Sequence, residues 1–382
     1  MFLSERRHCV AASGDYSTHM ALEVGLVGLP NAGKSTLFNA LTEAGAAAAP
    51  YPFTTVDPNV GVVPVPEARL QLVGERTGQE RRVLPTLEVV DIAGLVEGAH
   101  RGEGLGNQFL ARIREVDAIV QVVRCFSDPD VAHPVGSIDP AEDIKTVDRE
   151  LCAKDLESVS ARLERELPIA KSGDPRAREH VKTLEALADA LSEGRGARTV
   201  QRAGIEDVRD ELFLLTEKPA LIVANVSESA LPDGGEEVVP VQAILESQGD
   251  SRPLVVVAAQ IESELAELDT EEAKMFRDEL GLETGALDRI VRAAFDALDL
   301  VVFFTADGPE ARAWTSPRGT PIAAAVAQIH TDFQQGFIRA EVLAYSDLEE
   351  LDSIADAKHA GRVRTVGRDY PIEDGDLVHV MV

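Results

Sequence analysis

The stretch Leu22–Thr42, LEVGLVGLPNAGKSTLFNALT, decides the fold. Val24–Val27 has the apolar pattern of a short buried strand, and Thr36–Leu41 continues with the spacing of a helix. Gly28–Ser35, between them, fits the Walker A pattern G-x-x-x-x-G-K-[ST]. In that motif the glycines let backbone N–H groups surround a phosphate, and the following helix adds the positive end of its dipole. The stretch therefore predicts an α/β fold with a P-loop.

The same loop predicts individual roles. Lys34 is expected to reach the β- and γ-phosphates of a nucleotide and to be catalytic, and the Ser35 hydroxyl is expected to bind Mg²⁺. The predicted nucleotide contacts from this loop are Asn31, Ala32, Gly33, Lys34, Ser35 and Thr36. A chance match in a glycine-containing turn is the alternative, and the flanking strand and helix patterns argue against it.

A second motif lies in residues 87–106, LEVVDIAGLVEGAHRGEGLG. Asp91 follows a strand pattern and begins D-x-x-G, so its carboxylate is expected near Mg²⁺ and the Gly94 N–H near a γ-phosphate. Between the two motifs, residues 51–61, YPFTTVDPNVG, contain two threonines. The second of them, Thr55, is predicted to complete the metal site. A polar loop residue before a strand is the alternative for Thr55.

A third motif, VANVSE at residues 223–228, follows the buried strand pattern PALIVA. G proteins have Asn-Lys-x-Asp here; this chain keeps Asn225 but has Val226 and Glu228 in place of the lysine and aspartate. Glu228 is one methylene too long for the aspartate's paired hydrogen bonds to guanine. Because losing such a pair costs about 2 kcal/mol, guanine selectivity should collapse. The predicted base contacts are Asn225, Val226 and Glu228, and an ordinary strand-end turn is the alternative.

Length and charge limit the class of protein. A chain of 382 residues with 45% hydrophobic residues predicts two or three domains. No long apolar run or signal-peptide core occurs, so we expect a cytoplasmic protein without a membrane partner. The net charge of -29 repels nucleic acid, so RNA binding would need a local basic patch. The acidic, lysine-poor surface would also suit a high-salt cytosol.

The motifs together closely resemble the Obg-like ATPase (YchF) family of TRAFAC-class P-loop NTPases. The resemblance runs from about Leu22 to Val382 and rests on GLPNAGKSTLFNALT, YPFTTVDPNVGVVPVP, DIAGLVEGAHRGEGLGNQFL, VANVSE and a tail that includes IHTDFQQGFIRAEV and DYPIEDGDLVHV. It implies a P-loop G domain interrupted by a helical hairpin and followed by a β-grasp TGS domain. It also implies Mg²⁺-dependent hydrolysis of ATP to ADP and phosphate, with ATP preferred over GTP, and binding to the ribosome.

Hydrolysis needs a group that orients water, and the usual glutamine after D-x-x-G is replaced here by Leu95. His100 and His133 are the nearby candidates, and the family pattern has a histidine matching His133, which is therefore predicted as catalytic. Asn31 occupies the P-loop position that carries an asparagine in potassium-stimulated G proteins. K⁺ is accordingly a second candidate cofactor, because a cation there could neutralise phosphate charge.

The rest of the chain predicts the domain organisation. Apolar residues at helical spacing on both sides of LPIAKSGDP indicate an αα-hairpin, in which Asp174 and Pro175 begin the second helix and Gly194 ends it. The predicted parts are a disordered extension at 1–19, the G domain at 20–138 and 206–298, the hairpin (a coiled coil) at 139–205 and the TGS domain at 299–382. The hairpin could be a stabilising arm or a docking arm for a partner.

Partners and alternatives complete the expectations. The protein is expected to be a monomeric, nucleotide-dependent switch that binds ATP or ADP and the ribosome, with rRNA contact through the TGS domain. Six arginines in this domain could form the contact or could be ordinary solvated charge: Arg312, Arg318, Arg339, Arg362, Arg364 and Arg368. One rival function is a GTP-specific GTPase of the Obg class. Another is a non-catalytic scaffold gated by nucleotide, which Leu95 would favour.

Overall fold

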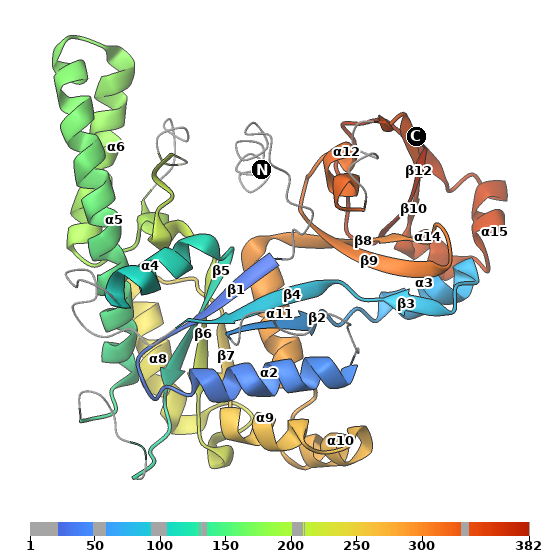
Figure 1. Cartoon of the computed structure of the whole chain (residues 1–382), viewed down its shortest axis with the longest axis horizontal. Coiled ribbons are helices and arrows are strands. Elements are labelled where there is room, and N and C mark those ends of the chain that lie inside the picture. The colour runs from blue at the N-terminus through green and yellow to red at the C-terminus, as the bar shows by residue number, and fades with distance from the viewer. Residues whose placement is uncertain are drawn as a thin grey trace. The chain divides into compact units, whose positions relative to one another are not determined.

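The computed structural model describes residues 22–48, 59–92, 105–129, 131, 136–200, 209, 211–329 and 336–381. They divide into two units, whose elements are labelled in Figure 1. The parallel-sheet unit comprises Glu23–Val63 and Glu88–Ala297, and the C-terminal unit contains Pro64–Leu87 and Leu298–Val382. The chain therefore leaves the parallel-sheet unit after Val63 and returns to it at Glu88.

The parallel-sheet unit is built on a sheet whose strand order, over the described residues, is β2-β4-β1-β5-β6-β7. The strand bounds are β1 Leu22–Val27, β2 Val60–Pro64, β4 Thr86–Asp91, β5 Ala118–Arg124, β6 Ala220–Asn225 and β7 Leu254–Val257. β1, β5, β6 and β7 run parallel. β5 and β6 are buried along their whole length, as expected of strands covered on both faces. Their carboxyl ends meet at one edge, where ligands bind in open α/β sheets.

Helices cover both faces of this sheet (Figure 1). On one face, α4 (Leu105–Glu115), α5 (Pro140–Lys171) and α8 (Gly235–Gln248) pack on apolar residues of β1, β4, β5 and β6. Elsewhere in the unit, α2 (Lys34–Ala48) and α9 (Ala259–Ala266) pack together. Along the chain, α9 is followed by α10 (Thr270–Glu279) and α11 (Ala286–Leu298). This α/β arrangement agrees with the predicted fold class.

The helical insertion is a hairpin of α5 and α6 (Pro175–Ser192). The Asp174 carboxylate accepts from the Ala177 N–H at 2.9 Å, and Pro175 is the first helical residue, as predicted. The predicted break was placed too early, because α5 continues through Pro168 to Lys171. A proline near the end of a helix removes only one N–H from the ladder, so the last turn survives.

The two halves of α5 have different partners. Ile144, Val147 and Leu151 pack against the sheet, whereas Val159 and the partly buried Leu163 pack against α6. The sequence pattern gave one uninterrupted apolar stripe and did not distinguish these two roles. Only the outer part of the hairpin is therefore a two-helix arm.

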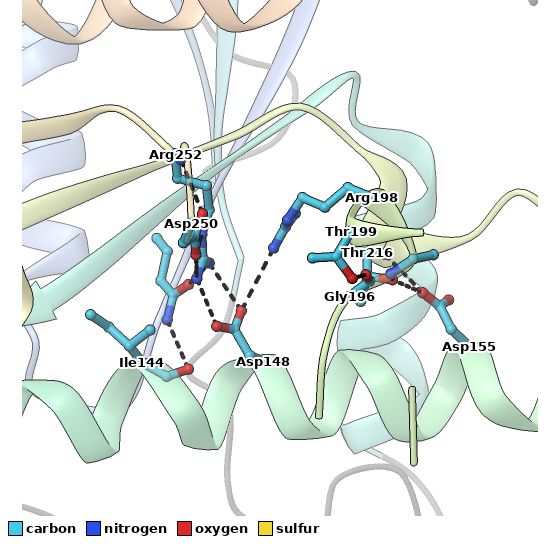
Figure 2. A network of polar contacts seen from close by, with 11 residues as sticks. Ile144, Asp148, Asp155, Gly196, Arg198, Thr199, Thr216, Asp250 and Arg252 are labelled. Atoms are coloured by element: carbon cyan, nitrogen blue, oxygen red, sulfur yellow. Dashed lines mark hydrogen bonds and ion pairs between the residues drawn. The ribbon is translucent and has the colours of Figure 1, made fainter. Parts of the chain in front are cut away.

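Two buried carboxylates on α5 fasten the base of the hairpin to the unit, and Figure 2 shows both. The Asp148 carboxylate accepts hydrogen bonds from Nη1 and Nη2 of Arg252 at 2.9 and 2.7 Å, and Arg252 also forms an ion pair with Asp250. Asp155 accepts from the backbone N–H groups of Leu215 and Thr216, each at 2.8 Å. The base of α5 is thus held by directional bonds as well as by apolar packing.

The C-terminal unit contains a mixed sheet with the strand order, among its described residues, β11-β10-β12-β8-β9-β3. The bounds are β3 Arg81–Val83, β8 Leu300–Thr305, β9 Glu310–Pro317, β10 Arg339–Ala344, β11 Arg364–Val366 and β12 Asp376–Met381. β8 and β9 form an antiparallel pair, and β8 runs parallel to β12. This arrangement agrees with the β-grasp domain that was predicted. Short helices complete the unit, namely α12 (Ile322–Ala325), α14 (Tyr345–Glu350) and α15 (Ile354–His359).

Residues 64–87, which the sequence alone kept within the first part of the G domain, contribute to this unit. β3 pairs in parallel with β9, and α3 (Arg69–Thr77) packs against β9 and α14. Arg69 donates to Asp374 at 2.6 Å and lies 5.6 Å from the centre of the Phe304 ring. No local sequence pattern predicts this pairing, because its partners are more than 200 residues apart.

Several of the six candidate RNA-binding arginines have acidic neighbours. Arg318 donates to Asp299 at 2.9 Å, Arg362 donates to Asp347 at 2.9 Å, and Arg364 lies 3.8 Å from Asp376. These contacts favour the interpretation of ordinary surface charge at those positions. Within the part of the chain that the structure describes, no helix is long and apolar enough to cross a membrane.

Candidate nucleotide site

The loop between β1 and α2 has a backbone that its glycines make possible. Gly28 and Gly33 have φ values of 152° and 93°, and Asn31 has a φ of 63°. A Cβ atom at Gly28 would lie 2.3 Å from the Val122 carbonyl oxygen, and one at Gly33 would lie 2.2 Å from Asn225 Nδ2. Both the left-handed conformation and the close packing therefore require glycine at these two positions. A loop whose backbone N–H groups surround a phosphate has the same requirement.

Lys34 is the first residue of α2, and its side chain turns back over the loop. Its Nζ donates to the carbonyl oxygens of Leu29 at 2.8 Å and Gly28 at 3.2 Å. The side chain is buried, and burial lowers its pKa, although the nearby Asp91 carboxylate partly offsets that effect. An ammonium group is thus held at the mouth of the loop without a direct carboxylate partner among the described residues.

Ser35 and Asp91, which the sequence assigned to the same metal, lie together. The Ser35 Oγ donates to Asp91 Oδ2 at 2.8 Å, although 56 residues separate them. A hydroxyl and a carboxylate are oxygen ligands of the kind that Mg²⁺ prefers, and Mg²⁺ usually completes its shell with water and phosphate. The residues present therefore fit Mg²⁺. The described part of the chain contains no cluster of three or more His, Cys, Asp or Glu side chains suited to a metal.

The third motif is joined to the P-loop by Asn225. Its Nδ2 donates to the Ala32 carbonyl oxygen at 3.0 Å, and its Oδ1 accepts from the Ala259 N–H at 3.0 Å. Val226 is buried, whereas Glu228 is exposed. The structure thus brings Asn225 to the phosphate loop and leaves the Glu228 carboxylate in solvent.

Sequence reasoning missed the residue that holds the third motif in place, where the base contacts are predicted. Glu237, in the first turn of α8, accepts from the Ser227 N–H at 2.8 Å and from the Ser227 hydroxyl at 2.7 Å. A carboxylate that accepts two such bonds fixes the backbone between Val226 and Glu228. A glutamate in the first turn of a predicted helix usually indicates only a favourable dipole interaction, so nothing in the sequence singled it out.

Some predicted site residues lie outside the described part of the chain. They are Thr55, Gly94, Leu95, His100 and His133. Thr36 is described and half-buried in α2, and Asn31 is exposed at the tip of the loop. The positions of the metal-completing threonine and the water-orienting histidine therefore stay predictions.

A buried lysine bound to loop carbonyls where a parallel strand passes into a helix is the arrangement of P-loop nucleoside triphosphatases. Family models agree, since residues 23–161 match MMR_HSR1, described as "50S ribosome-binding GTPase". Residues 300–382 match YchF-GTPase_C, described as "Protein of unknown function (DUF933)". Together with the relatives described next, these matches show that the chain belongs to the YchF family.

Relatives match this chain over nearly its whole length. The "Ribosome-binding ATPase YchF" of Bacillus subtilis (strain 168) is 46% identical over 94% of this chain and 99% of its own. "Obg-like ATPase 1" of Gallus gallus is 36% identical over 94% of this chain and 91% of its own. The solved YchF GTPase of Schizosaccharomyces pombe has a TM-score of 0.83 and 33% identity, covering 94% of this chain and 97% of that one.

Proposed function

We propose that this protein is a Mg²⁺-dependent ATPase that binds the ribosome and whose nucleotide state controls that binding. The observation that carries the proposal is the Lys34 ammonium held on the P-loop carbonyls, with the Ser35–Asp91 contact in the same unit. The names of relatives 46% identical along the chain support both the nucleotide and the ribosome. The organisation proposed is G domain, helical hairpin and TGS domain, with residues 64–87 assigned to the last.

Preference for ATP over GTP is part of the proposal. A guanine-specific site needs a carboxylate fixed in place, and the Glu228 carboxylate is exposed and has no hydrogen bond to another described residue. The buried Val226 and the backbone that Glu237 fixes through Ser227 remain as the wall of the base site. A wall of apolar atoms and backbone groups gives no extra binding energy to the two hydrogen-bond donors that distinguish guanine. The Obg-class GTPase is therefore the weaker candidate.

The metal ligands that we propose are Ser35, Asp91 and Thr55. When bound, Mg²⁺ would neutralise charge on the β- and γ-phosphates. Lys34 would hold the same phosphates, since its ammonium already lies on the carbonyl oxygens of the loop. Asn31, which is exposed in the loop, is the proposed residue for K⁺. His133 would orient the attacking water, because Leu95 has no side-chain hydrogen-bonding group.

Single-turnover hydrolysis of ATP tests two of these assignments, the role of His133 in orienting water and the use of K⁺. We expect His133→Ala to slow the chemical step by about 10²-fold, as for other groups that position a reacting water or proton. His100→Ala is the matched control and should leave the rate unchanged. The wild-type protein should hydrolyse faster in KCl than in NaCl. A normal rate in His133→Ala would remove the histidine from the mechanism, and equal rates in the two salts would remove K⁺.

Ribosome binding is proposed to take place in the cytoplasm, with the protein as a monomer and the TGS domain in contact with rRNA. The net charge of -29 opposes such contact through space, so binding must depend on a few arginines and weaken as salt rises. Because the nucleotide state is proposed to control binding, co-sedimentation with purified ribosomes should give different bound fractions with a non-hydrolysable ATP analogue and with ADP. Equal fractions under both conditions would argue against a nucleotide-dependent switch.

A further inference from the structure

Arg124, the last residue of β5, is a buried cation without a counter-charge among the described residues. It is 1% exposed. Its Nε and Nη2 donate to the carbonyl oxygens of Phe126 and Asp128, each at 3.3 Å, and its guanidinium lies 4.7 Å from the centre of the Phe126 ring. Nη1 is buried and has no hydrogen-bond partner. Carbonyl oxygens satisfy two donors but do not neutralise the charge.

Other buried arginines of the same unit show what is missing. Arg252 lies 2.7 Å from Asp148 and 2.6 Å from Asp250, as Figure 2 shows. Arg209 is paired with Glu217. Both have a carboxylate within ion-pair distance, as buried charges normally do. Arg124 departs from this rule, and a buried unpaired charge is costly enough to need an explanation.

The register of the sheet places Arg124 on the P-loop side of its carboxyl edge. Arg124 pairs with Asn225 of β6, so the two side chains leave the sheet on the same face. Asn225 contacts the Ala32 carbonyl oxygen of the P-loop on that face. The preceding residue, Val123, packs on the opposite face, with the core under α8. Arg124 therefore leaves the sheet on the face where Asn225 meets the P-loop, the loop that would bind the nucleotide phosphates.

We propose that Arg124 is a phosphate-binding residue, and that its Nη1 donates to an oxygen of the nucleotide's polyphosphate. The inference rests on the proposed nucleotide site and adds a cation that the Walker A, D-x-x-G and base-reading motifs do not include. The bound polyphosphate supplies the counter-charge that the described residues lack. The two carbonyl contacts hold the guanidinium in position before the nucleotide binds, so the side chain loses little conformational freedom on binding.

Dissociation constants for ATP, ADP and adenosine, measured on the full chain with Mg²⁺, test this inference. Arg124→Gln should weaken ATP by at least about tenfold, as expected for one charge-assisted hydrogen bond, and should weaken ADP as well. Adenosine, which has no phosphate, should bind as it does to wild type. Arg124→Lys should recover part of the ATP affinity, because it restores the charge without the planar fork.

The comparison among ligands separates phosphate binding from a structural role. Equal losses for ATP, ADP and adenosine, or no loss for any of them, would overturn the inference. If Arg124→Gln does not fold, the same comparison with Arg124→Lys decides. Arg252→Lys is the matched control, a buried arginine with carboxylate partners, and should leave the ratio of ATP to adenosine affinity unchanged. A wild-type protein that binds no nucleotide would instead defeat the proposed function itself.

Discussion

Replacing Lys34 with alanine is expected to lower ATP turnover by about 10³-fold, because its ammonium lies on the P-loop carbonyls, where the phosphates would bind. The fold should persist, since the Gly28 and Leu29 carbonyl oxygens that Lys34 releases lie at the ligand site and can be hydrated. Steady-state phosphate release measures the effect, and circular dichroism checks the fold.

A matched lysine provides the control for that result. Lys218 also donates to backbone carbonyls, those of Arg114 and Val116, but on a different loop of the same unit. Lys218→Ala should keep wild-type turnover per folded molecule. If Lys34→Ala kept its turnover as well, Lys34 would have no catalytic role. If the wild-type protein bound ATP without turnover above background, the scaffold alternative would replace the enzyme.

Removing the Asp148 carboxylate is expected to have the largest effect on stability. Asp148→Ala leaves Arg252 buried with Asp250 as its remaining carboxylate partner and releases α5 from the loop before β7. Breaking a buried pair by deleting one partner typically costs about 3–5 kcal/mol. The retained Asp250 contact should keep the loss at about 3 kcal/mol, which chemical denaturation can measure.

An exposed ion pair on the same helix is the control for this prediction. Glu157 accepts from Lys154 at 2.6 Å but is exposed, so Glu157→Ala should change the free energy of unfolding by about 0.5 kcal/mol or less. If Asp148→Ala were no more destabilising than Glu157→Ala, the network in Figure 2 would not be what holds the hairpin base in place.

The parts of the fold that the sequence predicted well are those encoded locally. The strand, glycine loop and helix of the P-loop, and the Asp174 cap with its following proline, each follow from residues within a few positions of one another. The order of the motifs along the chain also predicted that Ser35 and Asp91 lie together, because the carboxyl ends of neighbouring strands share an edge.

What the sequence did not predict depends on pairing between distant segments. Membership of residues 64–87 in the C-terminal unit depends on β3 pairing with β9, and neither segment has a pattern that selects the other. Glu237 looks like an ordinary helix residue until its hydrogen bonds to Ser227 are known. Arg124 looks like an ordinary strand residue until its burial and its unpaired Nη1 are known.

The central claim is that this P-loop holds a purine triphosphate in a base site that no longer selects guanine. Calorimetric titration of non-hydrolysable ATP and GTP analogues into one preparation, with Mg²⁺ present, tests it most directly. The ATP analogue should bind, and more tightly than the GTP analogue, because Glu228 is exposed and cannot serve as a fixed guanine clamp. Absence of binding by either analogue, or a GTP analogue bound tighter by orders of magnitude, would contradict the claim.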